Sequence, residues 1–397
     1  MDLVRINLTN FRNFSPKTEI ELPRAGLLVA AAPNAVGKTN FLESIMVLLR
    51  GKTWRARIQE CVKWGEDSFL LEGEIERQQD NDSRVAIRYH KPSHKIRIEE
   101  DGLPASVVAF YAHYPFVMFV PEDTFLLSRG PAQRRNFINH VLVCQPNYVS
   151  ALVQYHRVLR QRNEALKRAR SAADVSTWTD LLVEHATSVW RHRDNLVTYW
   201  NDKINEIYHS LSGEEKEFSI SLAFGTRDRE RLVDELNRAF RLEHRYGYTL
   251  YGPHRDDLVV LTKQKRVATA LSGGQMKSLV VALKILSHRY VRQVTKEEPL
   301  LLLDDVFSEL DEKRQVTLVE NLPNTQTIIT CTTLPEALRR REGVYLLDLQ
   351  SIIQEKGREK KSVGTGVTEE AASSFLDLEG GARAKKFQTE PEKVAVT

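Results

Sequence analysis

The sequence has few cysteines and lacks any long uninterrupted apolar run. Cys61, Cys144 and Cys331 stand far apart without a C-x-x-C pair, which argues against a disulfide framework and indicates reduced thiols. The first residues, MDLVRINLTNFRNF, carry charges where a signal peptide needs an apolar core. No apolar run approaches the ~18 residues that a membrane span requires. These absences predict a soluble protein of the cytoplasm.

A strong charge of one sign is also lacking. The 397 residues carry a net charge of +4, with 42% hydrophobic and 28% charged residues, as in ordinary globular chains. At ~100–200 residues per domain, this length predicts two or three structural units. Any affinity for an acidic partner must therefore come from local basic patches rather than from the whole chain.

Apolar patterns predict two α/β blocks that flank a helical insert. Strands are indicated by alternating stretches, LVRINLTNF and EIEL, and by unbroken apolar runs, GLLVAAA and PLLLLDDVF. Further strands are expected at 85–89 and 96–98, whereas long stretches rich in Arg, Glu, Leu and Trp between the blocks predict helices. We expect four units: the first half of the α/β block at 1–133, the helical insert at 134–245, the second half at 246–356, and a disordered tail at 357–397.

A phosphate-binding loop is predicted between the GLLVAAA strand and the helix that follows it. APNAVGKT fits G-x-x-x-x-G-K-[ST] except that Ala32 stands where the first glycine is expected. Backbone amides and the helix N-terminus would bind phosphate oxygens, and Gly37 would permit their close approach. Lys38 would reach the β- and γ-phosphates, and the Thr39 hydroxyl would ligate Mg²⁺. The methyl group of Ala32 is compatible with this role if its φ is negative. The nucleotide-binding residues expected here are Ala32, Pro33, Asn34, Ala35, Val36, Gly37, Lys38, Thr39 and Asn40.

Two carboxylates follow the second buried strand, PLLLLDD. Parallel α/β sheets place ligands at the carboxyl ends of their strands, so we expect Asp304 and Asp305 beside the phosphate loop. Asp304 has the position of the Walker B carboxylate that holds Mg²⁺. Asp305 would then orient or deprotonate the attacking water. The paired motifs thus predict an ATP-hydrolysing site with Lys38, Asp304 and Asp305 as catalytic residues.

A third motif, LSGGQMKSLVVALKIL, is typical of ABC-type ATPases. It places a hydroxyl and bare amides before a helix, where they would point at an anion. In ABC-type ATPases the signature of one subunit completes the phosphate-loop site of the other. The residues expected to act in this way are Ser272, which we also count as catalytic, Gly273, Gly274 and Gln275.

The whole pattern resembles the RecF family, short-armed relatives of the SMC-class ATPases. The stretches that carry the resemblance are LTNFRNF, PNAVGKTNFLESI, GKTWRARIQECVKWG, FVPEDTFLLSRGPAQRRNFI, VLRQRNEALK, YGPHRDDL, LSGGQMKSL and LLLLDDVFSELD. After TQTIIT the chain has CTT where transporter ATPases carry a switch histidine, so Thr330, Thr332 or Thr333 would do that work. Ala32, Asn139 and Lys277 depart from the family pattern.

The resemblance implies an α/β fold: an ABC-type P-loop ATPase head with a mixed sheet, and a helical second lobe inserted between the Walker A motif and the signature. It implies a weak, DNA-stimulated ATPase of recombinational repair in the cytoplasm, associated with the nucleoid. An ATP-dependent homodimer would clamp duplex DNA near single-strand gaps, release it on slow hydrolysis, and load recombinase with RecO and RecR. By resemblance, Arg12 lies near the phosphates, Glu122 or Asp123 near Mg²⁺, and Asp311 in the D-loop that follows Walker B.

Local basic residues are the candidates for DNA contact. Lysine and arginine neutralise phosphates and release counterions, which gives salt-sensitive binding. The residues expected to act in this way are Lys52, Arg55, Arg57, Arg157 and Arg160. The alternative for the last two is a solvated helix face with an Arg160–Glu164 pair. Two other functions stay open: a transport- or translation-type ABC ATPase, and an ATP-binding dimerisation module without significant turnover.

Overall fold

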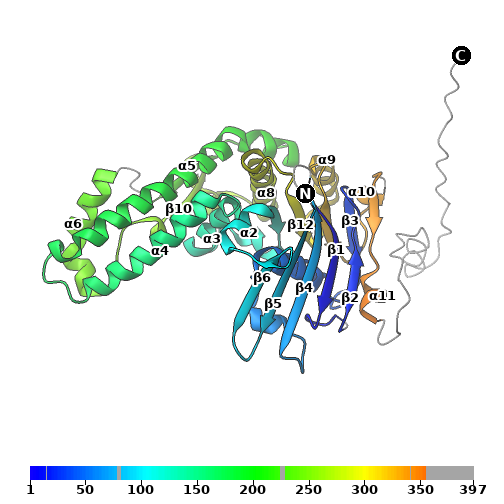
Figure 1. Cartoon of the computed structure of the whole chain (residues 1–397). Helices are drawn as coiled ribbons and strands as arrows, with labels where there is room; N and C mark the ends of the chain where they lie inside the picture. The colour runs from blue at the N-terminus through cyan, green and yellow to red at the C-terminus, as the bar shows by residue number, and fades with distance from the viewer. Residues whose placement is uncertain (15, 78–81, 224–228, 340, 355–397) are drawn as a thin grey trace, which may run out of the picture.

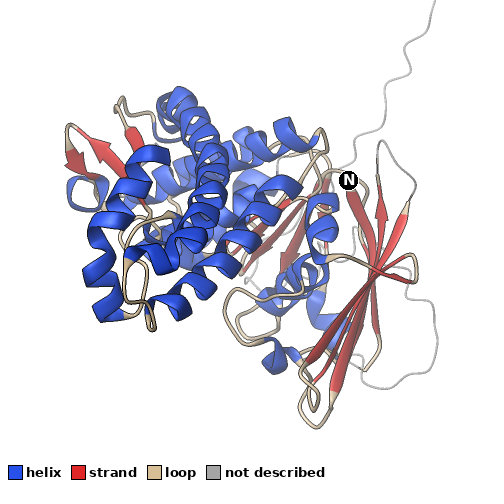
Figure 2. Cartoon of the chain, turned by 60° about the vertical axis from the view of Figure 1, so that its left-hand side comes forward, coloured by secondary structure: helices blue, strands red, loops and turns tan. Residues whose placement is uncertain are grey.

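The computed structural model describes residues 1–14, 16–77, 82–223, 229–339 and 341–354 (Figure 1). The predicted tail at 357–397 falls outside them. Two sheets enclose one helix on one side of the molecule, and long helices gather on the other side (Figure 2). Over the described ranges, no helix combines the length and the apolar character needed to cross a membrane.

The first sheet is antiparallel and is built from the predicted alternating strands. Side chains of β1 such as Ile6 and Leu8 are fully buried, and β5 alternates buried with exposed residues along its length. Its strands lie in the order β2-β1-β4-β5-β6-β7. They are β1 (Asp2–Thr9), β2 (Thr18–Glu21), β4 (Ser68–Glu76), β5 (Ser83–His90), β6 (Lys95–Glu100) and β7 (Leu103–Pro104).

The second sheet is parallel and lies at the centre of the head. Its order is β14-β3-β13-β12-β8, and every residue of β3, β12 and β13 is buried, as unbroken apolar runs predict. The strands are β3 (Leu27–Ala31), β8 (Phe116–Phe119), β12 (Leu300–Asp304), β13 (Thr327–Cys331) and β14 (Val344–Leu346).

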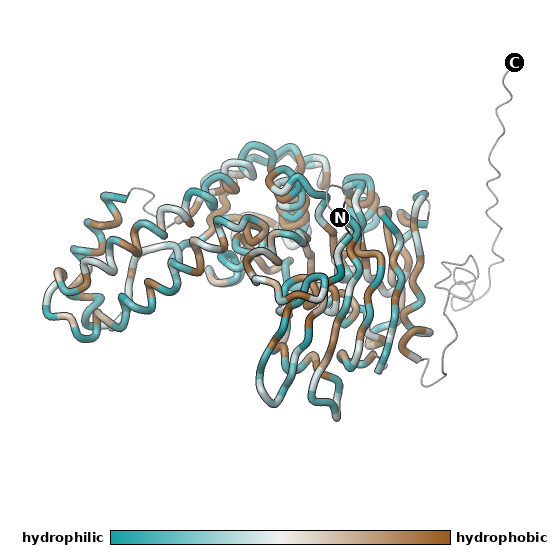
Figure 3. Tube along the Cα trace, viewed as in Figure 1, coloured by the Kyte–Doolittle hydropathy of each residue, from teal (hydrophilic) through white to brown (hydrophobic). Residues whose placement is uncertain are grey.

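Two helices cover opposite faces of the parallel sheet. Helix α1 (Lys38–Arg50) shares a hydrophobic core with Leu28 and Leu302, between the two sheets. Helix α8 (Gly273–Thr295) shares the other core with Val29 and Leu303. Neighbouring residues of each strand therefore face different helices. Hydrophobic and hydrophilic residues alternate along the coloured part of the trace (Figure 3).

The helical lobe projects from the α8 side of the sheet (Figure 1). Its helices are α3 (Pro131–Leu142), α4 (Pro146–Leu166), α5 (Ser176–Ser212) and α6 (Arg229–Tyr246). The predicted helical insert at 134–245 also contains one strand. Strand β9 (Ser219–Ala223) lies within it and pairs antiparallel with β10 (Asp257–Thr262). Its short alternation of polar and apolar residues, SISLA, is the strand signal that was missed.

The remaining elements are short. They are the helices α2 (Val107–His113), α7 (Val267–Ala270), α9 (Glu312–Asn321), α10 (Glu336–Arg339) and α11 (Leu349–Gln354), the strand β11 (Lys265–Arg266), and the 3-10 turns η1 (Ile58–Cys61), η2 (Pro121–Phe125), η3 (Ala172–Val175), η4 (Pro253–Arg255) and η5 (Val306–Glu309). All three cysteines are free and buried.

Candidate functional site

The predicted site residues meet at the carboxyl edge of the parallel sheet. Strands β3, β13, β12 and β8 are neighbours in that order, and all are parallel. The phosphate loop follows β3, Thr330 lies near the end of β13, Asp304 ends β12, and Glu122 follows β8. Because parallel strands place their carboxyl ends together, one ligand bound there can contact all four segments.

Ala32 does not strain the phosphate loop. Its backbone N–H donates to the Cys331 oxygen at 3.1 Å, which continues the pairing of β3 with β13. It is absent from the residues with positive φ, whereas Ala35 has a φ of 68° and Gly37 a φ of 126°. Its methyl group is fully buried. The condition set for a functional loop with alanine at this position is therefore met.

The Lys38 ammonium group lies inside the loop. Its Nζ donates to the Ala32 oxygen at 2.5 Å, the Pro33 oxygen at 3.3 Å and Asn34 Oδ1 at 3.4 Å. Burial lowers the pKa of Lys38, and the nearby carboxylates of Asp305 and Asp304 oppose that shift. The ammonium group is the part of this arrangement that suits a polyanion such as a nucleotide phosphate, since its three donors can bind phosphate oxygens.

Asp304 is fixed by two threonine hydroxyls. Thr330 Oγ1 donates to Asp304 Oδ1 at 2.6 Å, and Thr39 Oγ1 lies 3.3 Å from the same oxygen. Burial raises the pKa of Asp304, although both hydroxyls favour its charged form. Oδ1 of Asp305 is buried and has no hydrogen-bond partner among the residues that the structure describes. A hard cation with its water ligands fits this donor set, since Mg²⁺ prefers hydroxyl and carboxylate oxygens.

The two acidic residues after β8 have different roles. The Asp123 carboxylate accepts the Val120 N–H at 2.9 Å and pairs with Lys284 at 2.8 Å. These two contacts give Asp123 a structural role. Glu122 is exposed and stays the candidate for the cation side of the site. No group of three or more His, Cys, Asp or Glu side chains suited to a metal occurs in the described part of the chain. A Mg²⁺ ion here would therefore depend on nucleotide phosphates for most of its ligands.

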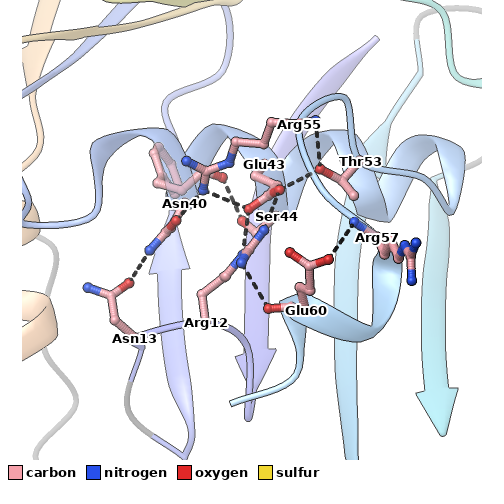
Figure 4. A network of polar contacts seen from close by, with 10 residues as sticks. Arg12, Asn13, Asn40, Glu43, Ser44, Thr53, Arg55, Arg57 and Glu60 are labelled. Carbon is pink, nitrogen blue, oxygen red and sulfur yellow. Dashed lines mark hydrogen bonds and ion pairs between the residues drawn. The ribbon is translucent and has the colours of Figure 1, made fainter. Parts of the chain in front are cut away.

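A buried carboxylate that the sequence reasoning missed organises the neighbourhood of the loop (Figure 4). Glu43 on α1 is fully buried. It accepts Arg12 Nε at 2.8 Å and Nη2 at 2.9 Å, Arg55 Nη2 at 2.8 Å and Thr53 Oγ1 at 2.5 Å. Burial alone would raise the pKa of Glu43, but these donors outweigh it and lower the pKa. The missed signal was a glutamate among the apolar residues of FLESIMVLL.

Glu43 holds two predicted residues beside the phosphate loop. Arg12 was predicted near the phosphates and Arg55 for DNA, and both guanidinium groups are bound to this one carboxylate. They line a pocket of about 600 Å³ together with Asn13, Asn40 and Trp64. Asn13 Nδ2 donates to the Val36 oxygen at 2.8 Å, which joins the pocket to the loop. Trp64 is 98% exposed.

The signature residues form the N-terminus of α8. Ser272 Oγ accepts the Gln275 N–H at 3.3 Å, and Gln275 Oε1 accepts the Ser272 N–H at 3.1 Å. A Cβ atom on Gly273 would meet nothing within 4 Å, whereas one on Gly274 would lie 3.3 Å from Arg314. Contacts with the described residues therefore do not explain why position 273 is glycine.

Asp311 acts as a helix cap. Its Oδ1 accepts the Arg314 N–H at 2.9 Å at the start of α9, and its carboxylate also pairs with the Arg314 guanidinium group. These two contacts explain why position 311 is an aspartate without any contribution from a second chain. Its predicted contact with nucleotide stays a prediction.

The GPHRDD segment is a connector whose two aspartates are buried, whereas its Arg255 is exposed. Asp256 accepts Arg193 Nη1 at 2.6 Å and Trp190 Nε1 at 2.9 Å. Asp257 accepts Arg134 Nε at 2.6 Å. Its glycine, Gly252, has a φ of 134°, and a Cβ there would lie 2.3 Å from the Tyr155 hydroxyl. The segment therefore ties β10 to α3, α4 and α5, a role that the sequence did not reveal.

The other predicted DNA contacts lie in two separate places. Lys52 and Arg57 are exposed after α1, and Arg157 and Arg160 are exposed on α4. The alternative pairing of Arg160 with Glu164 is not formed. In the structure Glu164 pairs with Lys167 at 2.6 Å.

The loop geometry makes a prediction for position 37, which is glycine in this chain, and for position 32, which is alanine. Gly37→Ala is expected to weaken binding of a fluorescent ATP analogue by about 10-fold or more, since its φ is left-handed and costs about 1–2 kcal/mol with a side chain. The new Cβ would also lie 2.9 Å from Asn13 Nδ2. Ala32→Gly is the matched control and should change the affinity by less than about 3-fold. Equal effects at both positions would contradict this account of the loop.

Comparison with known proteins adds relatives and structural neighbours, although no protein-family model matches the chain. It is 32% identical over 336 residues to a DNA replication and repair protein RecF of Thermoanaerobacter sp. (strain X514), covering 82% of this chain and 92% of the relative. It is also 32% identical over 347 residues to RecF of Geotalea daltonii, covering 84% and 94%.

Solved structures agree with these relatives. The recombination mediator protein RecF-ATP in the RecFOR pathway superposes with a TM-score of 0.79 at 27% identity, covering 88% of this chain and 96% of that one. An SmcHead bound to the C-winged helix domain of ScpA has a TM-score of 0.53 at 14% identity, covering 87% and 96%. The second likeness concerns the fold alone.

Proposed function

The chain belongs to the RecF family of DNA replication and repair proteins, and from that premise we propose that it is an ATP-driven DNA clamp. Two copies join when each binds ATP, hold duplex DNA near single-strand gaps, and separate after slow, DNA-stimulated hydrolysis. Its partners are a second copy of the chain, gapped DNA, RecR and RecO.

The observation that carries the proposal is the placement of the two nucleotide-binding helices. The phosphate loop begins α1 on one face of the parallel sheet, and the signature begins α8 on the other face. Ser272 and Gly273 are exposed, and Gly273 has open space around its Cα. This arrangement supports a site in which the signature of one chain approaches the nucleotide of the other.

The chemistry follows from the groups at the carboxyl edge of the sheet. Lys38 and the loop amides bind the β- and γ-phosphates. Thr39 and Asp304 would hold Mg²⁺, which would neutralise phosphate charge when bound. Asp305 Oδ1 is buried and has no partner in the described part of the chain. It accepts a hydrogen bond from the attacking water and takes its proton as the bond to the γ-phosphorus forms. The bond to ADP breaks, and Lys38 stabilises the charge that develops on the leaving oxygen.

The pocket beside the loop is suited to the nucleoside end of ATP. Arg12, Asn13 and Asn40 line it next to the phosphates, and the exposed ring of Trp64 lies at its border. Because Glu43 already binds both guanidinium groups, they stay in place before the nucleotide arrives.

ATP binding is accordingly expected to change the fluorescence of Trp64, and Trp64→Phe serves as the control for that signal.

The test of the clamp is the mass of the protein with ADP and with ATP, measured by light scattering, followed by addition of gapped duplex DNA. ATP is expected to double the mass and to enable salt-sensitive DNA binding. Lys38→Ala should weaken ATP binding by about 10- to 100-fold, because it removes charged hydrogen bonds to phosphate, and should abolish both responses.

The matched control is Lys52→Ala, an exposed lysine after the same helix that should leave ATP-dependent doubling intact. The clamp proposal is contradicted if the protein stays monomeric with ATP and binds DNA with the same affinity in the presence and absence of ATP.

A further inference from the structure

A surface with two exposed tyrosines lies in the helical lobe where α6 ends, far from the proposed ATP site (Figure 1). Tyr246 is 51% exposed and Tyr248 is 40% exposed. Their rings are stacked, with centroids 5.5 Å apart and planes 12° from parallel. The Arg255 guanidinium carbon lies 5.2 Å from the centre of the Tyr248 ring. Three flat groups are therefore in contact in the order Arg255, Tyr248, Tyr246.

The segment that carries this stack is held rigidly. Leu250 N–H donates to Glu243 Oε1 at 2.7 Å, and the buried Glu243 pairs with the buried Arg162 at 2.8 Å. Thr249 N–H donates to Asn163 Oδ1 at 2.8 Å. The two tyrosines are thus displayed on a turn whose base is fixed in the core of the lobe. A preorganised surface loses little conformational entropy on binding.

The surroundings of the stack are basic. From His244 to Arg255 the chain carries Arg245 and Arg255 and no acidic residue. Both arginines are exposed, and neither forms an ion pair with any residue that the structure describes. A Cβ atom added at Gly247 would lie 3.5 Å from Cγ of Lys167, so the side chain of this lysine lies beside the turn. A partner that binds here should therefore be an anion with flat apolar groups.

We propose that Tyr246, Tyr248 and Arg255 form a binding site for unpaired bases of single-stranded nucleic acid. A base stacks on the Tyr246 ring, the more exposed end of the stack, and the neighbouring arginines neutralise the phosphates. Duplex DNA fits this surface less well, because its bases are already stacked on one another. The inference rests on the proposed DNA-binding function and adds to it a place for the unpaired strand of a gap.

The experiment uses the full chain with a fluorescein-labelled oligo-dT of about 15 nucleotides, followed by anisotropy, with blunt duplex DNA in parallel. Stacking is worth ~1–3 kcal/mol per base, so the double variant Tyr246→Ala/Tyr248→Ala should bind oligo-dT about 5- to 100-fold more weakly. Tyr246→Phe/Tyr248→Phe should retain binding, because the rings remain. Arg255→Gln should lower the slope of log affinity against log salt by about 0.7.

Val153→Ala is the control for loss of an exposed apolar side chain, since Val153 is 53% exposed elsewhere on the lobe. The proposal is overturned if the double alanine variant binds oligo-dT like the wild type, if it loses duplex binding to the same extent, or if the wild type does not bind oligo-dT. Failure of the clamp is distinct from these results: ATP would then neither double the mass nor enable binding of duplex DNA.

Discussion

Asp305→Asn is expected to slow ATP hydrolysis by about 100-fold or more while leaving the ATP-dependent dimer intact. A positioned general base contributes about 10²- to 10⁴-fold to such a reaction, and an amide cannot accept the proton. The substitution should not disturb the fold. Asp305 has a φ of 46°, a conformation that asparagine also tolerates. The measurement is phosphate release under single-turnover conditions, with light scattering on the same samples.

Asp304→Asn is the matched comparison one residue earlier. Asp304 is held by Thr330 and Thr39 on the cation side of the site, so its loss should weaken Mg²⁺-dependent ATP binding as well as turnover. Wild-type turnover by Asp305→Asn would mean that another group activates the water. A wild-type protein that dimerises with ATP and never hydrolyses it would instead favour the dimerisation module without turnover.

Asp256→Ala is expected to lower the free energy of unfolding by about 3–5 kcal/mol, because it leaves the buried Arg193 guanidinium without its partner. Burial raises the pKa of Asp256 to about 6, so the carboxylate is charged at pH 7 and pairs with Arg193 at 2.6 Å. Trp190 Nε1 would lose its acceptor in the same variant. Chemical denaturation at pH 7 measures the loss.

Two further variants decide whether the ion pair causes this effect. Arg84→Ala removes an arginine that is 81% exposed and pairs with Glu74, and it should change stability by only about 0.5 kcal/mol. Asp256→Ala combined with Arg193→Met should cost less than the sum of the two single changes, since no buried charge is then left unpaired. Additive losses would show that packing, rather than charge, stabilises this connector.

The buried ion pairs also explain why the GPHRDD segment carries two aspartates in a row. Arg134 lies 123 positions before Asp257, and Arg193 lies 63 positions before Asp256. Each pair joins the segment to a different helix of the lobe. The predicted boundary at residue 245 therefore separates stretches that are joined by buried ion pairs and by the pairing of β9 with β10.

The sequence by itself determined the α/β fold of the head and the placement of the phosphate loop, Asp304 and Asp305 at one edge of the parallel sheet. Strand, glycine turn and helix follow one another within a few positions in APNAVGKTN, and the carboxylates of LLLLDD end their own strand, so local pattern was enough to predict them. For Ala32, the sequence set a condition on its own backbone conformation, and the absence of Ala32 from the residues with positive φ meets that condition.

Tertiary structure alone decided which distant side chains meet. Glu43 binds Arg12 and Arg55, which come from segments on either side of it in the sequence. Tyr246, Tyr248 and Arg255 form one surface only when the turn at Gly247 folds against the end of α4. No periodicity or spacing encodes such contacts. They depend on how helices and sheets pack, and packing is a property of the whole chain.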